Sequence, residues 1–463
     1  MRVRALVAIA ALSGAAAFAL PRSVQANGRF PMAQVITAPP DGDGKTLYMR
    51  STFGVLTSTD SGKHFRWLCE EAIGFTGSWD PPIAATRDKR LFIGLEKGLR
   101  VTKGGCDVKV VPELEGELVS DLSVQPDGIH AMVITATAGK PAGLYLENAK
   151  GQFVRVGEGP TGYRFDTLDA APSKPERIYL TGVDYTKKPY GHFFRSDDGG
   201  KTLVDTQPKL EKDGTLFLSG IDPKNPDRLY VREIRSEDGF TEILVSDDGG
   251  KTFRSTLSRP TALYGFTLAP DGQTLYAVAA DAKEGLFRSD DRGEHWKSVL
   301  KVGLTCLFAN RTSVYGCSNP FQKGGYAIGE SKDKGEHFLP LAGFAEVQGP
   351  VLCDGGPISA CVAPWPKIQA NLLPGSDDAG TDVGDAGVDP SPDAAAPAPT
   401  APPSASSSSA ASAPPARSGC GCAAGGSPTA PLIPLLGIAT LLTISRRKRG
   451  SSRVHGGGRS PLG

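Results

Sequence analysis

The chain has 463 residues, and its charges nearly cancel, since 51 lysines and arginines stand against 50 aspartates and glutamates. This length is ample for a folded core. The balanced charge offers no basic face, so the composition argues against nucleic acid as a partner.

The first 26 residues have the pattern of a secretory signal peptide. Arg2 and Arg4 supply the positive start, residues 5–20 form an apolar run, and Val24-Gln25-Ala26 fits a cleavage site of small residues. We therefore expect export and cleavage after Ala26. The alternative, a retained membrane anchor, fits the short apolar run less well.

Residues 27–373 contain five copies of a motif that reads Ser-x-Asp-x-Gly-x-x-(aromatic or Leu). A strand-like run precedes each copy and a large apolar residue ends it, so the motif is predicted to be a hairpin loop. The aspartate can accept hydrogen bonds from the backbone of its own turn, and the glycine can adopt a positive φ. The predicted structural residues are Ser58, Asp60 and Gly62; Ser196, Asp198 and Gly200; Ser246, Asp248 and Gly250; Ser289, Asp291 and Gly293; Ser331, Asp333 and Gly335.

The motif resembles the Asp-box, or BNR repeat, of sialidase-like, sortilin-like and Ycf48-like β-propellers. Two weaker copies, around Gly105 and Gly151, fill the gaps, and the loop glycines then recur about every 42–50 residues, the period of a four-stranded propeller blade. Pro/Asp/Gly turns that lead into Tyr-bearing strands support the same phase. We predict an all-β, seven-bladed β-propeller over residues 27–373. Six or eight blades stay open, because residues 344–362 hold further strand-like runs.

Six of the eight cysteines lie in the predicted propeller, and an exported protein favours disulfides. Two pairs flank turn-like segments, at Arg311-Thr312 and at residues 354–357, and each pair is expected to face its partner across a hairpin. Zinc is the competing interpretation, but this region has no C-x-x-C pair. The predicted disulfides are Cys306–Cys317, Cys353–Cys361 and Cys69–Cys106, although other pairings stay open.

The motif aspartates recur around the ring and cannot converge on one site, and the same holds for the histidines that follow three of them. His130 and His192 occupy non-repeating positions, but the sequence suggests no partner for either. No nucleophile elbow, zinc-protease motif, P-loop or dinucleotide fingerprint occurs. We therefore assign no catalytic residue, no metal site and no cofactor.

Resemblance to sialidases implies a further requirement, an arginine triad with a Tyr/Glu nucleophile pair and an acid aspartate. Arg29-Phe30-Pro31 is the nearest local match to the motif that supplies the first arginine of the triad. Segments that differ between blades point to a binding face instead: residues 70–79, 184–192 and 235–240 mix aromatic and charged side chains. The sequence favours a non-catalytic propeller that binds a protein or polysaccharide partner. The alternative is a glycoside hydrolase of the sialidase or xyloglucanase-like type, so enzymatic activity stays open.

The C-terminal segment changes character. Residues 374–417 are rich in Asp, Ala, Pro and Ser and are predicted to be a disordered linker, and residues 450–463 a disordered tail. Residues 418–449 carry Cys420 and Cys422, a hydrophobic segment at 430–445 predicted as a short helix, and the basic cluster Arg446-Arg447-Lys448-Arg449.

This combination resembles the myxobacterial C-terminal sorting tag (MYXO-CTERM). The resemblance implies a sorting protease that cuts near Cys420 or Cys422 and a protein anchored through its C-terminus at the cell surface or outer membrane. The alternative is an ordinary single-pass transmembrane anchor, for which the hydrophobic run is short and broken by Pro434 and Gly437.

Overall fold

The computed structural model describes residues 30–373, except 41–43, 76–79, 185–187, 211–212, 236, 280 and 322–323. The predicted signal peptide with Ala26, the linker, and the C-terminal tag with Cys420 and Cys422 lie outside the described residues. Within the described part, no helix is both long and apolar enough to cross a membrane.

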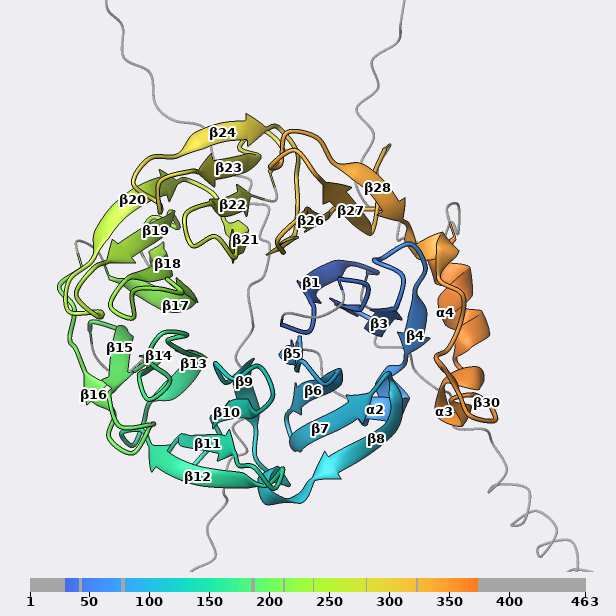
Figure 1. Cartoon of the computed structure of the whole chain (residues 1–463), viewed down its shortest axis with the longest axis horizontal. Helices are drawn as coiled ribbons and strands as arrows, with labels where there is room; N and C mark the ends of the chain where they lie inside the picture. Colours follow the sequence, from blue (N-terminus) through green and yellow to red (C-terminus); the bar gives the residue numbers. More distant parts are fainter. Residues whose placement is uncertain are drawn as a thin grey trace, which may run out of the picture. The chain divides into compact units, whose positions relative to one another are not determined.

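Seven four-stranded antiparallel sheets form a ring (Figure 1), which confirms the predicted all-β, seven-bladed propeller. Each blade uses four consecutive strands, ordered from the ring centre outward. The innermost strands are β1 (Ala33–Thr37), β5 (Ile83–Ala85), β9 (Val119–Val124), β13 (Arg164–Ala170), β17 (Gly214–Ile221), β21 (Leu263–Leu268) and β25 (Cys306–Ala309). The second strands are β2 (Leu47–Ser51), β6 (Arg90–Leu95), β10 (Ala131–Thr135), β14 (Ile178–Val183), β18 (Leu229–Arg235), β22 (Leu275–Ala279) and β26 (Val314–Cys317).

The third strands are largely buried, whereas most of the outermost strands are exposed to solvent. The third strands are β3 (Gly54–Ser58), β7 (Gly98–Lys103), β11 (Gly143–Glu147), β15 (Gly191–Ser196), β19 (Thr241–Ser246), β23 (Leu286–Ser289) and β27 (Ile328–Ser331). The outermost strands are β4 (Arg66–Leu68), β8 (Cys106–Val111), β12 (Phe153–Glu158), β16 (Val204–Asp205), β20 (Arg254–Arg259), β24 (Lys297–Leu300) and β28 (Leu339–Ala342).

The core lies between neighbouring blades rather than inside any one of them. Met132 and Leu144 of the third blade pack with Leu168 and Phe194 of the fourth, and all four are almost fully buried. Side chains alternate between the two faces of a strand, so a buried blade needs apolar residues on both. The second strands show this, since every residue of β10 and β14 is buried. Each large side chain buried this way contributes about 1.5–3 kcal/mol.

The Tyr-bearing strands predicted from the sequence are second strands, and their tyrosines join blades. Tyr179 is fully buried, and its hydroxyl donates to the carbonyl of Pro226 in the next blade at 2.8 Å. The hydroxyl of Tyr48 donates in the same way to the carbonyl of Lys89 at 3.2 Å. The proline-rich turn and the tyrosine of successive repeats therefore form one inter-blade contact.

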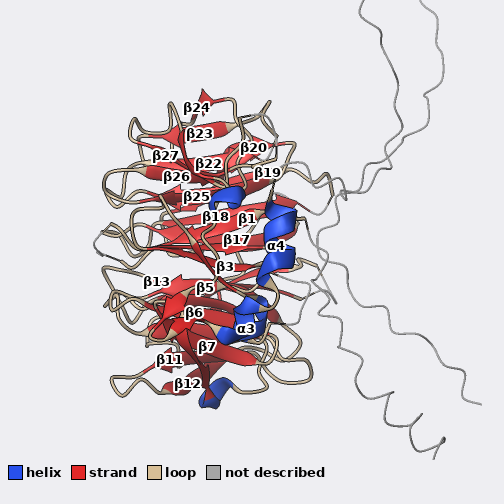
Figure 2. Ribbon diagram, turned by 90° about the vertical axis from the view of Figure 1, so that its right-hand side faces the viewer, coloured by secondary structure: helices blue, strands red, loops and turns tan. Residues whose placement is uncertain are grey.

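The first and last blades share no strand. They meet at the ring seam, where the hydroxyl of Thr305 donates to the carbonyl of Ala33 at 2.8 Å. The chain then continues past β28 along the outside of the first two blades (Figures 1 and 2). This segment, residues 344–373, contains η3 (Phe344–Glu346), β29 (Leu352–Cys353), β30 (Gly356–Pro357), α3 (Ser359–Val362) and α4 (Trp365–Leu372).

We call residues 344–373 the clasp. Its backbone joins β4, because Trp67 N donates to Gly349 O at 2.8 Å and Val351 N donates to Trp67 O at 2.9 Å. The strand-like runs that left an eighth blade open therefore close the ring from outside instead. Two short elements lie on the connections between blades. α2 (Glu70–Ile73) follows β4 and contacts α3 of the clasp, and η2 (Pro112–Leu114) follows β8 and contacts β7 and β12.

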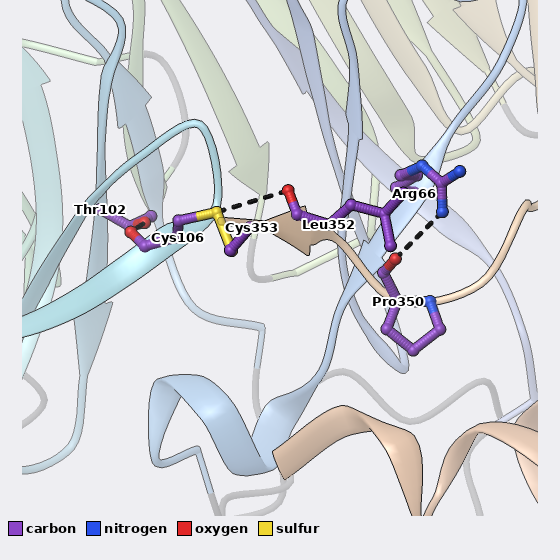
Figure 3. Close-up of a disulfide and its surroundings, with 6 residues drawn as sticks. All are labelled: Arg66, Thr102, Cys106, Pro350, Leu352 and Cys353. Carbon is purple, nitrogen blue, oxygen red and sulfur yellow. Dashed lines mark hydrogen bonds between the residues drawn. A yellow bond between two sulfur atoms is a disulfide. The ribbon is translucent and has the colours of Figure 1, made fainter. Parts of the chain in front are cut away.

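The disulfide Cys306–Cys317 is confirmed, and the two residues are paired across β25 and β26. The predicted pairs Cys353–Cys361 and Cys69–Cys106 are wrong: the structure has Cys69–Cys361 and Cys106–Cys353 (Figure 3). Cys353 does begin a tight hairpin, but Cys361 lies beyond it on α3, so the two do not face each other. The clasp crosses two blades, so Cys361 bonds to the first blade and Cys353 bonds to the second. Beside the second disulfide, Arg66 donates to Pro350 O at 3.3 Å.

Candidate functional site

The five motif copies form loops between the third and outermost strands of their blades, and we call them the Ser-Asp-Gly loops. In the central copy, Gly250 N donates to the Ser246 hydroxyl at 2.9 Å, and that hydroxyl donates to Asp248 at 2.9 Å. Asp248 Oδ1 also accepts from Thr252 N at 2.9 Å. Gly250 has a φ of 85°, and a Cβ there would lie 2.3 Å from the ring of Phe193 in the neighbouring blade. Both the backbone shape and the packing thus require glycine.

The hydrogen bonds fix the charge of these aspartates. Donation from the backbone of Thr202, and then from Ser196, lowers the pKa of Asp198 to about 2. The backbone of His295 is the main cause of the same lowering for Asp291, also to about 2. Both carboxylates are held as anions within their own turns, and a catalytic proton transfer would need a group that titrates near the working pH.

The loops define two faces of the ring. The Ser-Asp-Gly face carries these loops together with the connections between first and second strands. The opposite, insertion face carries the connections between second and third strands and those between blades. All three segments singled out from the sequence belong to the insertion face: 70–79 lies between blades, while 184–192 and 235–240 link second to third strands. They extend from different blades, and residues 76–79, 185–187 and 236 are not described.

Both non-repeating histidines have a carboxylate partner that the sequence did not suggest. His192 is 8% exposed, and its Nδ1 lies 2.8 Å from Asp205 Oδ2 on the outermost strand of the same blade. Its ring packs edge-on against Tyr163, with 4.7 Å between centroids. His130 pairs with Asp127 in a surface turn, with 2.5 Å between Nδ1 and Oδ2. The His192–Asp205 partnership is long-range, which explains why no local motif revealed it.

Three carboxyl groups lie on inner strands at the ring centre, and the sequence did not single them out. Asp121 on β9 accepts from Leu168 N of the next blade at 2.9 Å, and Asp169 accepts from the Ser123 hydroxyl at 3.0 Å. Burial raises the pKa of Asp121 to about 7 and that of Asp169 to about 6. Burial also raises the pKa of Asp166.

Asp121 occupies the register position that Thr167 occupies in the fourth blade, since Asp121 pairs with Ile134 and Thr167 pairs with Thr181. The hydroxyl oxygen of Thr167 accepts from Leu218 N at 2.9 Å, which is the same bond to the next inner strand. A neutral hydroxyl makes this bond without a charge. An aspartate at this position of an inner strand is the signal by which Asp121 could have been found.

A cavity of about 580 Å³ opens on the Ser-Asp-Gly face where the first, sixth and seventh blades meet. Its walls come from the loops that end the inner strands, so it lies beside the ring centre. The apolar lining includes Pro39, Pro40, Pro270 and Phe308, and the polar lining includes Thr46, Asn310, Arg311 and Thr312. Apolar walls with a few polar groups are typical of small-molecule sites.

No group of three or more His, Cys, Asp or Glu side chains suitable for a metal ion is found among the described residues.

No protein-family model matches the chain. Among curated proteins, an oligoxyloglucan-reducing end-specific xyloglucanase from Emericella nidulans is 27% identical over 139 residues. That match covers 28% of this chain and 17% of the enzyme, so the chain spans about a sixth of its curated relative.

Several solved structures resemble the chain at low identity. The GH74 xyloglucanase from Xanthomonas campestris is 13% identical, with 66% of each chain covered and a TM-score of 0.37. Hydrazine synthase from Kuenenia stuttgartiensis is 12% identical, with 65% of this chain and 96% of that chain covered and a TM-score of 0.44. YCF48 bound to D1 peptide is 11% identical, with 62% and 91% covered and a TM-score of 0.43. The ring of seven blades, rather than any one of these likenesses, shows that the chain has a β-propeller fold.

Proposed function

We propose that this chain is a carbohydrate-active β-propeller that binds a neutral, xyloglucan-type oligosaccharide in the cavity beside the ring centre. The cavity of about 580 Å³ is the observation that carries the proposal. Sugar rings present flat C–H faces and a rim of hydroxyls. Phe308 and the prolines offer apolar surface for the C–H faces. Thr46, Asn310 and Thr312 offer polar atoms for the hydroxyls.

The charge of the lining favours a neutral sugar. Recognition of a sialic acid carboxylate would call for several arginines, and the described lining contains one, Arg311, with no aspartate or glutamate. The sequence similarity to an oligoxyloglucan-specific enzyme supports the same substrate class. Because the match spans a small part of that enzyme, its activity comes to this chain only as a proposal.

Mutation of the cavity rim tests this function. Thr312 is exposed on the rim, so Thr312→Trp should obstruct the cavity without disturbing the core. We expect calorimetry with xyloglucan oligosaccharides to show binding to the full-length protein and at least tenfold weaker binding to this variant. Val204→Trp, which adds the same side chain to the exposed outer strand of the fourth blade, should bind normally. Equal binding by all three proteins would refute the site.

Hydrolysis is a second candidate function, favoured by the carboxyl groups at the ring centre. Glycosidases use one carboxyl that is protonated and a second that is ionised. With pKa values of about 7 and about 6, Asp121 and Asp169 would occupy these two states between pH 6 and 7. Release of reducing sugar from xyloglucan oligosaccharides that disappears in folded Asp121→Asn would support hydrolysis. Binding without any turnover by the wild type would leave the propeller a binding protein.

Three further proposals rest on the sequence. We propose that the Ser-Asp-Gly loops are true Asp-boxes, in keeping with their spacing and internal hydrogen bonds. We propose that residues 1–26 direct export, and that residues 374–417 separate the propeller from a sorting tag at 418–449. The protein would then be anchored through its C-terminus at the cell surface or outer membrane, after a sorting protease has acted near Cys420 or Cys422.

A further inference from the structure

A second cavity, of about 240 Å³, lies on the fifth blade and has the opposite character to the first. Its lining includes two glutamates, Glu233 and Glu242, and three apolar side chains, Leu210, Leu244 and Phe253. Exposed Arg254 and Ser255 complete the lining, so the cavity reaches the outside along β20. Nothing in the proposed function uses it.

The two glutamates are directly opposed across β18 and β19, and their environments differ. Glu242 accepts from Arg235 at 2.6 Å and from the Ser258 hydroxyl at 2.9 Å, so its charge is compensated. Glu233 is 3% exposed, and its Oε1 has no hydrogen-bond partner. A buried carboxyl oxygen without a donor destabilises the folded state, so it needs an explanation.

Gly214 on β17 makes room for the side chain of Glu233. A Cβ on Gly214 would lie 2.7 Å from Glu233 Cγ and 2.8 Å from its Oε1. The glycine thus allows the carboxyl group to pack against β17 while the side chain lines the cavity. The site is built into the blade rather than formed by a surface loop.

The charged groups around Glu233 make the cavity suitable for a cation. Glu242 stands opposite, Asp213 and Asp238 lie nearby, and Arg235 is the nearest positive charge but is already bonded to Glu242 and Asp238. Arg254 is paired with Asp247 and Glu294. Burial and the charge of Glu242 raise the pKa of Glu233 to about 7, so a bound cation and a proton would compete for the same carboxylate.

We propose that this cavity binds a primary ammonium group carried on a short apolar chain. An ammonium donates three hydrogen bonds, which suits the acceptors of Glu233, Glu242 and Ser255. Leu210, Leu244 and Phe253 would contact the carbon chain, and the ring of Phe253 can also attract the cation. The described lining has only two carboxylates, fewer oxygen ligands than calcium requires. A free small amine and the lysine side chain of a partner protein share this chemistry.

Calorimetry of the full-length protein with n-butylamine tests the proposal, with n-butanol as the neutral counterpart of the same shape. Alkylamines stay protonated at pH 6 and pH 8, so Glu233 controls the pH dependence. We expect binding of the amine and not of the alcohol, and about tenfold weaker binding at pH 6 than at pH 8. Equal binding of the alcohol, no pH dependence, or no amine binding at pH 8 would overturn the proposal.

Two variants locate the site. Glu233→Gln keeps the shape and removes the charge, and should abolish both the binding and its pH dependence. Leu210→Trp should fill the cavity and abolish binding with Glu233 intact. Glu96→Gln, on an exposed turn of the second blade, is the matched control and should bind like the wild type. Unchanged binding by either cavity variant contradicts the site.

The source of the amine is decided by a capped Gly-Lys-Gly peptide. Binding comparable to n-butylamine would identify the cavity as a receptor for a lysine side chain of a partner. Binding of n-butylamine alone would assign it to free amines. Because these probes contain no sugar, failure here leaves the oligosaccharide site untouched, and the reverse also holds.

Discussion

The aspartate of a Ser-Asp-Gly loop stabilises its turn by accepting several hydrogen bonds. Asp248 accepts from Lys251 N at 3.0 Å and from Thr252 N at 2.9 Å, and its Oδ2 accepts from the Thr252 hydroxyl at 2.6 Å. We expect Asp248→Ala to lower the free energy of unfolding by about 1–3 kcal/mol, because the turn loses its acceptors. Chemical denaturation measures this change.

Lys251→Ala, in the same loop but on an exposed side chain, is the control and should change stability by less than about 0.5 kcal/mol. Oligosaccharide binding by folded Asp248→Ala should equal that of the wild type. Weakened binding with an unaltered unfolding curve would contradict a purely structural role for the loop.

Asp121 should make stability depend on pH. Its folded-state pKa of about 7 lies above the unfolded value, so the unfolded chain releases the proton first and stability falls as pH rises from about 4 to 7. Asp121→Asn keeps an acceptor for Leu168 N and removes the charge. We expect the variant to be more stable than the wild type by on the order of 2 kcal/mol at pH 8, and by little at pH 4.

Denaturant unfolding at the two pH values measures the difference. A stability change of the same size at pH 4 and pH 8 would show that the carboxyl group does not carry this dependence. The aspartate would then be a neutral replacement for the threonine that the fourth blade has at this position.

At the scale of elements, the clasp replaces a shared closing strand. Its two disulfides link residues 292 and 247 positions apart, whereas Cys306–Cys317 spans only 11. In the chain-entropy model longer loops stabilise more, about 5–6 kcal/mol for loops of this length against about 3 kcal/mol for a short loop. We expect Cys69→Ser/Cys361→Ser to destabilise the protein more than Cys306→Ser/Cys317→Ser.

Hydrogen exchange can locate the effect. In Cys69→Ser/Cys361→Ser, amides of β1, β4 and β25 should exchange faster than in the wild type, because these strands border the seam or carry the clasp. Amides of β14 and β18, across the ring, should change little. Uniformly faster exchange around the ring would mean that the clasp does not act as a local closure.

At the scale of the whole molecule, the proposed anchoring makes a prediction about chain ends. We expect the mature surface protein to begin near Asn27 and to end near Cys420 or Cys422, because a signal that is removed need not be a good permanent span. Intact-mass measurement of surface protein tests this. Replacing both cysteines by serine should leave the basic cluster attached and misplace the protein. Full-length chains ending at Gly463, with the double variant still at the surface, would favour a plain transmembrane anchor.

What the sequence determined by itself is local and repeated. Each Ser-Asp-Gly loop is specified within eight residues, and its recurrence specifies the blade. The five full copies and two weaker ones together specify the ring, because each blade packs only on its neighbours. Cys306–Cys317 was predictable for the same reason, since one hairpin brings the two residues together. The sequence left six or eight blades open, because the clasp also contains strand-like runs.

Only the tertiary structure decided what depends on residues far apart in the chain. Cys69–Cys361 and Cys106–Cys353 depend on the path of the clasp across two blades, which no hairpin symmetry encodes. The cavity at the seam is formed by loops from the two ends of the propeller, and the donor that binds Asp121 is Leu168 N of another blade. A local loop geometry recurs in the sequence, so its pattern can be recognised. Ring closure brings each distant pair of residues together only once, and a contact that occurs once produces no sequence pattern.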